Sequence, residues 1–449
     1  MPQKYMDTPI EYGKTIINKF IPKGTNAQVL EIDTEVQRVS DLEQRLDEIL
    51  NDPIDSPSLR ELVKNHYQPG EQVIILTDDN TRPNSHTRLL LPLLYPKLID
   101  YGVKEEDVGI LVASGTHRPP TEQEIREQVL GDSIWDKYHD HVMIHNCDEG
   151  IKQIGSSTRG TPIYLNEEAI SACLLIAMTD SEYHYFAGVA GTVKQIFPGI
   201  SGRKTISKNH PKAFTKETGF RPECRLGNTE GNPVIQDMIE MVKIVNETKP
   251  IFCVDAILHH KEIVHLNAGD IISLHMKARE LLKPLREIEV EQGADLTIIT
   301  TGELGLNLYQ ADKGIHAAWN ATKKGGKILL LARAQDGVGN KPYHETMLAV
   351  KDKDVAEALA WVVANKCSEE TFRIGNQKPV DLLRILKQNQ IDMITEMDHE
   401  ELKETFRINP VEIEGNVQDT LRQYVKQFLQ ENKAGLIYVM NDAGLYVKT

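Results

Sequence analysis

The sequence predicts an α/β protein with mostly parallel sheets, and two observations support this. Short apolar runs alternate along the 449 residues with longer segments of helical periodicity, which is typical of repeated strand and helix units. One run, ACLLIAM at 172–178, is apolar at every position, as a strand buried on both faces of a sheet requires. The predicted strands are, in order, residues 73–76, 108–112, 142–144, 172–178, 251–257, 296–299 and 328–331.

The length of the chain favours two domains, since a single core rarely organises more than about 250–300 residues. A charged helical stretch at 276–292 precedes ADLTIITTG, which begins a second α/β unit. We therefore expect an N-terminal domain over residues 1–285 and a C-terminal α/β domain over residues 290–449. The last strand-like segment, 436–440, could pair within the second domain or return to the first.

The charge of the chain bears on its partners. The sequence carries a net charge of −15 at pH 7 and has a pI near 5.5. A surface that binds nucleic acid or an anionic membrane needs clustered Lys and Arg, so neither is expected as a partner. A small anionic substrate remains open, because a few basic residues focused in a cleft can bind it.

The cysteines and the hydropathy favour a cytoplasmic protein. The five cysteines are scattered and never spaced as CxxC, which indicates neither a disulfide framework nor a structural zinc site. The N-terminal segment MPQKYMDTPIEYGK lacks the apolar core of a signal peptide, and no apolar run is long enough to span a bilayer. We expect a reducing compartment.

Polar loops follow the predicted strands at the ends where parallel sheets bind ligands. TDDNTRP, with Asp79 and Arg82, follows the strand at 73–76, and SGTHRPP, with His117, follows the strand at 108–112. The sequence TEQE at 121–124 predicts a capping box that begins a helix. His117 is therefore expected in the loop between strand and helix.

The loop after residues 172–178 holds the densest set of functional groups. From Tyr183 to His210 it contains His184, Lys194 and four glycines. Imidazoles can ligate metals or move protons, and a lysine amine can form a covalent adduct. Any one of these residues alone is more often a solvated loop residue, so the interpretation depends on the set.

In the second domain, the strand at 296–299 leads into TGELGLNLYQADKG, which contains Gln310 and Lys313. If all these loops converge, their imidazoles and cations suit an anionic substrate; the residues alone leave convergence open. Two weaker motifs are interpreted as structural. Residues 337–339 form only a GxG, and the pair His259 and His260 lacks the i, i+4 spacing of a helical metal site.

The order of the motifs carries a family resemblance. DDNTRP, SGTHR, His184 ten residues before Lys194, PGISG, His210 sixteen residues after Lys194, and YQADKG together resemble the nickel-pincer nucleotide-dependent lactate racemase family. The motifs extend from about Asp78 to Lys313. The resemblance implies that residues 1–285 form the cofactor-binding catalytic domain and that the active site lies in a cleft between the two domains.

The resemblance also implies a cofactor and the residues that hold it. Lys194 corresponds to the lysine covalently attached to the nickel-pincer nucleotide, a pyridinium-thioamide-thiocarboxylate mononucleotide. His210 corresponds to the protein ligand of its nickel, and soft donors with one imidazole suit that metal. The loop near the cofactor corresponds to Asp79, Asn80, Thr81 and Arg82.

For the reaction, the resemblance implies a racemase or epimerase that inverts the 2-hydroxy carbon of a 2-hydroxycarboxylate by transient hydride transfer to the cofactor. His117 and His184 correspond to the catalytic acid/bases. The substrate-binding residues correspond to Arg82, Gln310 and Lys313. The implied partners are the small anionic 2-hydroxyacid and the cofactor-synthesis enzymes.

Several alternatives stay open. The substrate could be lactate, malate, a longer or aromatic 2-hydroxyacid, or a sugar acid. Two departures from the family pattern bear on the seating of the cofactor and on the identity of the substrate. They are GTVK, where relatives commonly show a second glycine, and ELGLN, where an acidic residue close to the tyrosine is usual. A zinc hydrolase could use His184 and His210, but it would not need Lys194. A non-catalytic nickel or nucleotide carrier would not need His117 and Lys313.

Overall fold

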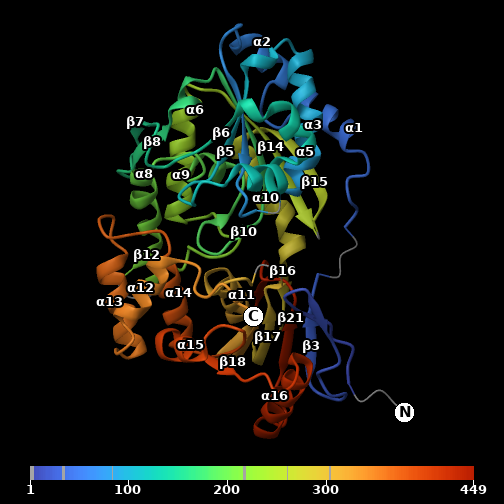
Figure 1. Ribbon diagram of the computed structural model, residues 1–449, viewed down its shortest axis with the longest axis vertical. Coiled ribbons are helices and arrows are strands. Elements are labelled where there is room, and N and C mark those ends of the chain that lie inside the picture. Colours follow the sequence, from blue (N-terminus) through green and yellow to red (C-terminus); the bar gives the residue numbers. More distant parts are fainter. Residues whose placement is uncertain (1–4, 33–35, 83, 216–218, 260, 303–304) are drawn as a thin grey trace. The chain divides into compact units, whose positions relative to one another are not determined.

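The computed structural model describes residues 5–32, 36–82, 84–215, 219–259, 261–302 and 305–449 (Figure 1). The chain divides into two compact units. We name them the N-terminal unit, which comprises Thr34–Ala213 and Pro222–Leu285, and the C-terminal unit, which comprises Met1–Asp33, Phe214–Arg221 and Arg286–Thr449.

The N-terminal unit is built on a six-stranded sheet in the order β15-β14-β9-β4-β5-β6. All neighbouring strands are parallel except β14 and β15, which form an antiparallel pair. The strands are β4 (Val73–Asp78), β5 (Val108–Ala113), β6 (Val142–Ile144), β9 (Leu174–Asp180), β14 (Ile251–His259) and β15 (Glu262–Asp270). A hairpin of β7 (Ile151–Ser156) and β8 (Pro162–Asn166) and the short pair β10 (Tyr183–His184) and β11 (Gly188–Val189) lie outside this sheet.

Helices of the N-terminal unit cover this sheet (Figure 1). They are α1 (Leu42–Asn51), α2 (Leu59–His66), α3 (Ser85–Asp100), α4 (Glu122–Glu124), α5 (Asp132–Tyr138), α6 (Glu167–Ser171), α7 (Val193–Ile196), α8 (Arg203–Asn209), α9 (Pro233–Asn246) and α10 (Ile271–Arg286). The predicted capping box at 121–124 is confirmed: the Thr121 hydroxyl accepts from the Glu124 N–H, and the Glu124 carboxylate accepts from the Thr121 N–H.

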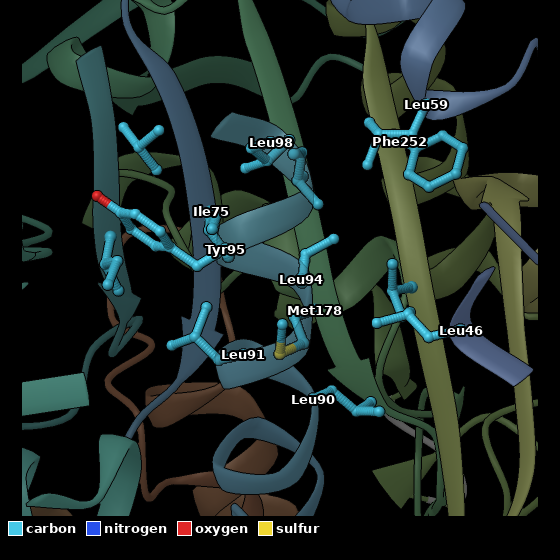
Figure 2. Close-up of a cluster of buried hydrophobic side chains, with 14 of the residues drawn as sticks. Leu46, Leu59, Ile75, Leu90, Leu91, Leu94, Tyr95, Leu98, Met178 and Phe252 are labelled. Atoms are coloured by element: carbon cyan, nitrogen blue, oxygen red, sulfur yellow. The ribbon is translucent and has the colours of Figure 1, made fainter. Parts of the chain in front are cut away.

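The core on one face of the sheet forms between α3 and the strands (Figure 2). Leu90, Leu91, Leu94 and Leu98 recur at helical spacing along α3 and are buried with Ile75, Met178 and Phe252 of the sheet. This packing fixes β4, β9 and β14 beneath the loops that follow them. The strand ends that lead into these loops are therefore held in place by the core.

The C-terminal unit has its own six-stranded sheet, β20-β19-β18-β17-β21-β3, with every neighbouring pair parallel. Its strands are β3 (Ala27–Leu30), β17 (Ala294–Thr300), β18 (Thr322–Leu331), β19 (Gln390–Ile394), β20 (Asn409–Val411) and β21 (Ile437–Met440). Its helices are α11 (Leu308–Ala321), α12 (Lys341–Ala349), α13 (Val355–Lys366), α14 (Gln377–Leu386), α15 (His399–Phe406) and α16 (Val417–Glu431). Short pairs are β1 (Ile10–Tyr12) with β2 (Thr15–Ile17), β12 (Phe214–Thr215) with β13 (Gly219–Phe220), and β16 (Glu287–Glu289) with β22 (Tyr446–Lys448).

The predicted α/β class with mostly parallel sheets is confirmed, and each predicted strand is present. The strand at 142–144 has the predicted bounds, whereas β18 begins at Thr322 rather than at 328. The N-terminal unit differs from the expected domain over 1–285 at its beginning and at Phe214–Arg221, which also groups with the C-terminal unit. The first 33 residues belong with the C-terminal unit, because β3 pairs with β21. The segment predicted at 436–440 is β21 and lies inside the C-terminal sheet rather than in the N-terminal one. Within the described residues, no helix combines the length and the apolar composition needed to cross a bilayer.

Candidate active site

The sheet of the N-terminal unit has a topological switch between β4 and β9. From β4 the chain proceeds to β5 and β6 on one side, and from β9 it proceeds to β14 on the other. In open α/β sheets, ligands bind outside the carboxyl ends of the strands at such a point. The loops after β4, β5 and β9 meet this condition, and they hold most of the predicted site residues.

Asp79 and His117 form the first cluster at this edge. Asp79, which is buried, follows β4, and its Oδ2 lies 2.6 Å from Nδ1 of the half-exposed His117. Thr81 donates its hydroxyl to the other oxygen, Oδ1, over 2.5 Å. Burial alone would raise the pKa of Asp79, but the bonds from His117 and Thr81 lower it, so the carboxylate is ionised. Asn80 is half-buried in the same turn.

Arg82 joins this cluster to the loop after β9. Its Nη1 lies 2.6 Å from Oε1 of Glu182. Two more carboxyl groups, Asp78 and Asp180, stand at the ends of β4 and β9, and burial raises the pKa of Asp78 to about 7 and that of Asp180 well above its usual range. The guanidinium thus lies near two carboxyl groups whose pKa burial raises, and also near Glu182 and the ionised Asp79.

Phe186 is the centre of the second cluster. Its ring centroid lies 4.6 Å from that of His184 and 5.4 Å from that of His210, and Nζ of Lys194 lies 6.0 Å from it. The short pair β10 and β11 brings His184 and Gly188 opposite each other, which folds the loop back over Phe186. Three predicted site residues are therefore gathered around one ring.

The hydrogen bonds around His184 and His210 indicate their tautomers. The backbone N–H groups of Phe186 and Ala187 donate to Nδ1 of His184 over 3.4 and 3.1 Å, so this nitrogen carries a lone pair. Nδ1 of His210 lies 3.2 Å from Oδ1 of Asn209, which can only accept. His210 therefore carries its proton on Nδ1. Burial, helped by the charge of Lys194, lowers the pKa of His210 to about 3, so its imidazole is neutral.

Gln310 and Lys313 lie on α11 of the C-terminal unit, in the first two turns of the helix. Asn307 caps this helix by accepting the Gln310 N–H at 3.0 Å. A buried ion pair, Lys378 Nζ to Asp312 Oδ2 at 3.1 Å, ties α11 to α14 beside Lys313. Glu303 and Leu304 of the ELGLN segment, like His260, lie outside the described residues.

The structure thus brings the predicted residues of the N-terminal unit into two neighbouring clusters, and it places the two C-terminal residues on one helix of their own unit. Sequence reasoning missed Glu182, Phe186 and Lys378. Phe186 stands between His184 and Lys194, so its position offered a signal. Glu182 and Lys378 act through tertiary contacts and offered none. Within the described residues, no three His, Cys, Asp or Glu side chains are grouped so as to hold a metal ion.

Comparison with known families covers most of the chain. Residues 12–220 match the family model described as the lactate racemase N-terminal domain, and residues 290–445 match the lactate racemase C-terminal domain. Lactate racemase of Thermoanaerobacterium thermosaccharolyticum is 30% identical over 406 residues, which are 88% of this chain and 90% of that protein. Lactate racemase of Lactiplantibacillus plantarum is 31% identical over 314 residues, which are 69% and 70% of the two chains.

Solved structures give the same result. The lactate racemase apoprotein from T. thermosaccharolyticum superposes with a TM-score of 0.82 at 26% identity, over 99% of this chain and 100% of that one. A protein from Thermotoga maritima matches with a TM-score of 0.62 at 15% identity, over 90% and 98% of the two chains, and shows the fold alone. With both domain models matched in order and this identity spread over nearly the whole length, the chain belongs to the lactate racemase family of isomerases.

Proposed function

We propose that this protein is a racemase or epimerase of a small 2-hydroxycarboxylate and that it works with a nickel-pincer nucleotide attached to Lys194. The observation that carries the proposal is the gathering of His184, Lys194 and His210 around Phe186. The cluster of Asp79 and His117 stands at the same edge of the sheet. Lactate is the first candidate substrate, and malate, longer or aromatic 2-hydroxyacids and sugar acids are the alternatives.

The residues present fit the proposed cofactor. A buried, neutral imidazole is the form of histidine that binds metals, and Asn209 fixes the proton of His210 on Nδ1, which leaves a lone pair on Nε2. Asn209 is itself held, because its amide donates to the Val234 carbonyl and to Asp237. When bound, the cofactor would supply a reversible acceptor for the Cα hydrogen of the substrate as hydride.

His117 is suited to accept the hydroxyl proton of the substrate. Because Asp79 is ionised and only accepts, Nδ1 of His117 donates to it and Nε2 carries the lone pair. The carboxylate also stabilises the imidazolium that forms once a proton has arrived. His117 would therefore act as a base at Nε2 for one enantiomer and return that proton as an acid for the other.

His184 starts from the opposite tautomer. Its Nδ1 accepts two backbone N–H groups, so the proton of the neutral ring is on Nε2. In this state it can donate a hydrogen bond to the substrate. To accept a proton at Nε2 it must first release these backbone bonds. We therefore propose that the two histidines have unequal tasks in the resting protein.

The carboxylate of the substrate needs cations. Arg82 uses Nη1 for Glu182 and has further N–H groups of its fork for a second carboxylate. Lys313 and Gln310, on α11 of the C-terminal unit, are proposed to bind the substrate as well.

The test uses protein made together with the cofactor-synthesis enzymes. Intact mass should show a covalent increment that Lys194→Arg abolishes while the charge at the position is kept, and His210→Ala should lower the nickel content but leave the increment in place. A panel of single enantiomers of the candidate 2-hydroxyacids, followed by chiral chromatography, should identify the substrate.

Isotopes test the chemistry. A Cα-deuterated substrate should racemise with its label largely retained, since the hydrogen leaves as hydride and does not exchange readily with water. Rapid loss of deuterium to solvent would indicate proton abstraction from carbon and would refute the proposed reaction. A covalent increment that persists in Lys194→Arg would refute the assignment of the lysine.

A further inference from the structure

Thr192, directly before α7, has an unfavourable backbone conformation. Its φ is 43° and its ψ is −114°, and a β-branched residue is a clear outlier at positive φ. The preceding Gly191 also has a positive φ of 74°, and a Cβ there would lie 2.7 Å from the Asp180 carbonyl oxygen at the end of β9. The turn that leads into Lys194 is thus strained and pressed against the sheet.

A buried hydrogen bond holds this strained turn. Oγ1 of Thr192 lies 2.7 Å from Nδ1 of His275 on α10, and both side chains are fully buried. Two backbone hydrogen bonds connect this turn to Lys194 and Gln195. The Lys194 N–H donates to the Gly191 carbonyl at 2.9 Å, and the Gln195 N–H donates to the Thr192 carbonyl at 2.8 Å. A shift of Thr192 would therefore move the backbone of Lys194.

His275 holds the turn with only one of its two ring nitrogens. Its Nε2 is buried and has no hydrogen-bond partner among the described residues. Burial lowers the pKa of His275 to about 4, and the positive charge of Lys194 contributes, so the imidazole is neutral. A neutral imidazole with one buried nitrogen unsatisfied is costly unless something satisfies it.

We propose that Thr192 and His275 are positioning residues for Lys194: their hydrogen bond holds the strained turn that directs the lysine toward Phe186 and His210. This role rests on the proposed function for the attachment itself. The position of the lysine, however, is a property of the protein without any cofactor.

The experiment measures the reactivity of Lys194 in the cofactor-free protein. Limited acetylation followed by peptide mass spectrometry gives its labelling rate relative to the exposed Lys433. Thr192→Val keeps the shape of the side chain and removes the hydroxyl, and Thr192→Ser keeps the hydroxyl and serves as the matched control. We expect a several-fold change of the relative rate in Thr192→Val and a rate close to wild type in Thr192→Ser.

Equal rates in wild type, Thr192→Val and Thr192→Ser would overturn the proposal. If Thr192→Val does not fold, His275→Phe removes the same hydrogen bond and keeps a similar ring volume. A several-fold change of the relative labelling rate in His275→Phe would then support the proposal, and a rate equal to wild type would overturn it. In protein made with the cofactor-synthesis enzymes, the yield of covalent increment should fall in the same order as the change in labelling. If wild type gains no increment at all, the proposed function fails, while the labelling series still decides on the positioning pair.

Discussion

Asp255 should make the stability of this protein depend on pH in an unusual direction. The residue lies in β14 with only 3% of its surface exposed, and the hydroxyls of Thr179 and Ser181 both donate to its Oδ1, over 2.5 and 2.8 Å. Burial raises its pKa to about 7, although these two bonds lower it in part, and the charge of Asp78 adds to the rise. The neighbouring Asp180, whose pKa burial also raises, is coupled to the same group.

The sign follows from the protons bound. Between the ordinary carboxyl pKa of 3.8 and about 7, the native state keeps a proton on Asp255 that the unfolded chain has released. The stabilisation is fully present below the lower value and is lost as pH rises through the upper one. At about 1.4 kcal/mol for each pKa unit, the loss amounts to about 4 kcal/mol.

Asp255→Asn removes this titration and keeps the acceptor oxygen for both hydroxyls. Relative to wild type, its free energy of unfolding should rise steadily between pH 4 and pH 7 and stay level above. Urea titrations followed by circular dichroism at several pH values measure this difference. The exposed Asp100→Asn is the matched control and should show no such trend. A difference between Asp255→Asn and wild type that stays constant over the whole range would refute the argument.

Three further variants test other parts of the site. Asp79→Asn leaves His117 without its carboxylate partner and should slow racemisation on the order of 10²-fold, while the covalent mass increment stays unchanged. A turnover equal to that of wild type would show that Asp79 does not support the acid/base function. Gly188→Ala should lower the free energy of unfolding by at least about 2 kcal/mol, because φ of Gly188 is 84° and the new Cβ would lie 2.2 Å from the Asn228 carbonyl oxygen. Urea unfolding measures this change, and an unchanged midpoint urea concentration would contradict the prediction. Phe186→Leu keeps an apolar side chain but loses the ring contacts, which are worth about 0.5–1.5 kcal/mol each. Nickel analysis after dialysis should show that this variant retains less nickel than wild type. Equal nickel retention would show that the ring does not support the metal site.

Most strands that sequence reasoning predicted are continuously buried, and β6 at 142–144, which is only partly buried, is the exception. Residues 73–76 and 174–178 are apolar at every position because helices cover both faces of the sheet, and this composition is visible in one sequence. β3 was missed because AQVL is short and partly exposed, and its partner lies at residues 437–440. The start of β18, TKKGGK, was missed because exposed polar residues carry no hydrophobic period.

The grouping of the proposed site residues could be predicted where they follow the strand ends and match the family motifs. His184, Lys194 and His210 belong to one loop, and the structure gathers them around Phe186. The contact of Thr192 with His275 could not be predicted, because 83 residues separate them and no sequence pattern links the two. Asp255 was equally hidden, since a carboxyl group in a buried strand is tolerated only through tertiary hydrogen bonds.

The pairing of β3 with β21 has a consequence for biosynthesis. During translation, residues 27–30 leave the ribosome long before residues 437–440, so this edge of the C-terminal sheet forms only after β21 has been made. The N-terminal unit is contiguous over most of its length, so it can fold while the ribosome is still working. Until β21 has been made, Ile10, Phe20 and Ile21, which are fully buried in the folded protein, remain uncovered in the nascent chain. A fragment that begins near residue 286 would lack β3 and present β21 as an open edge, a template for aggregation.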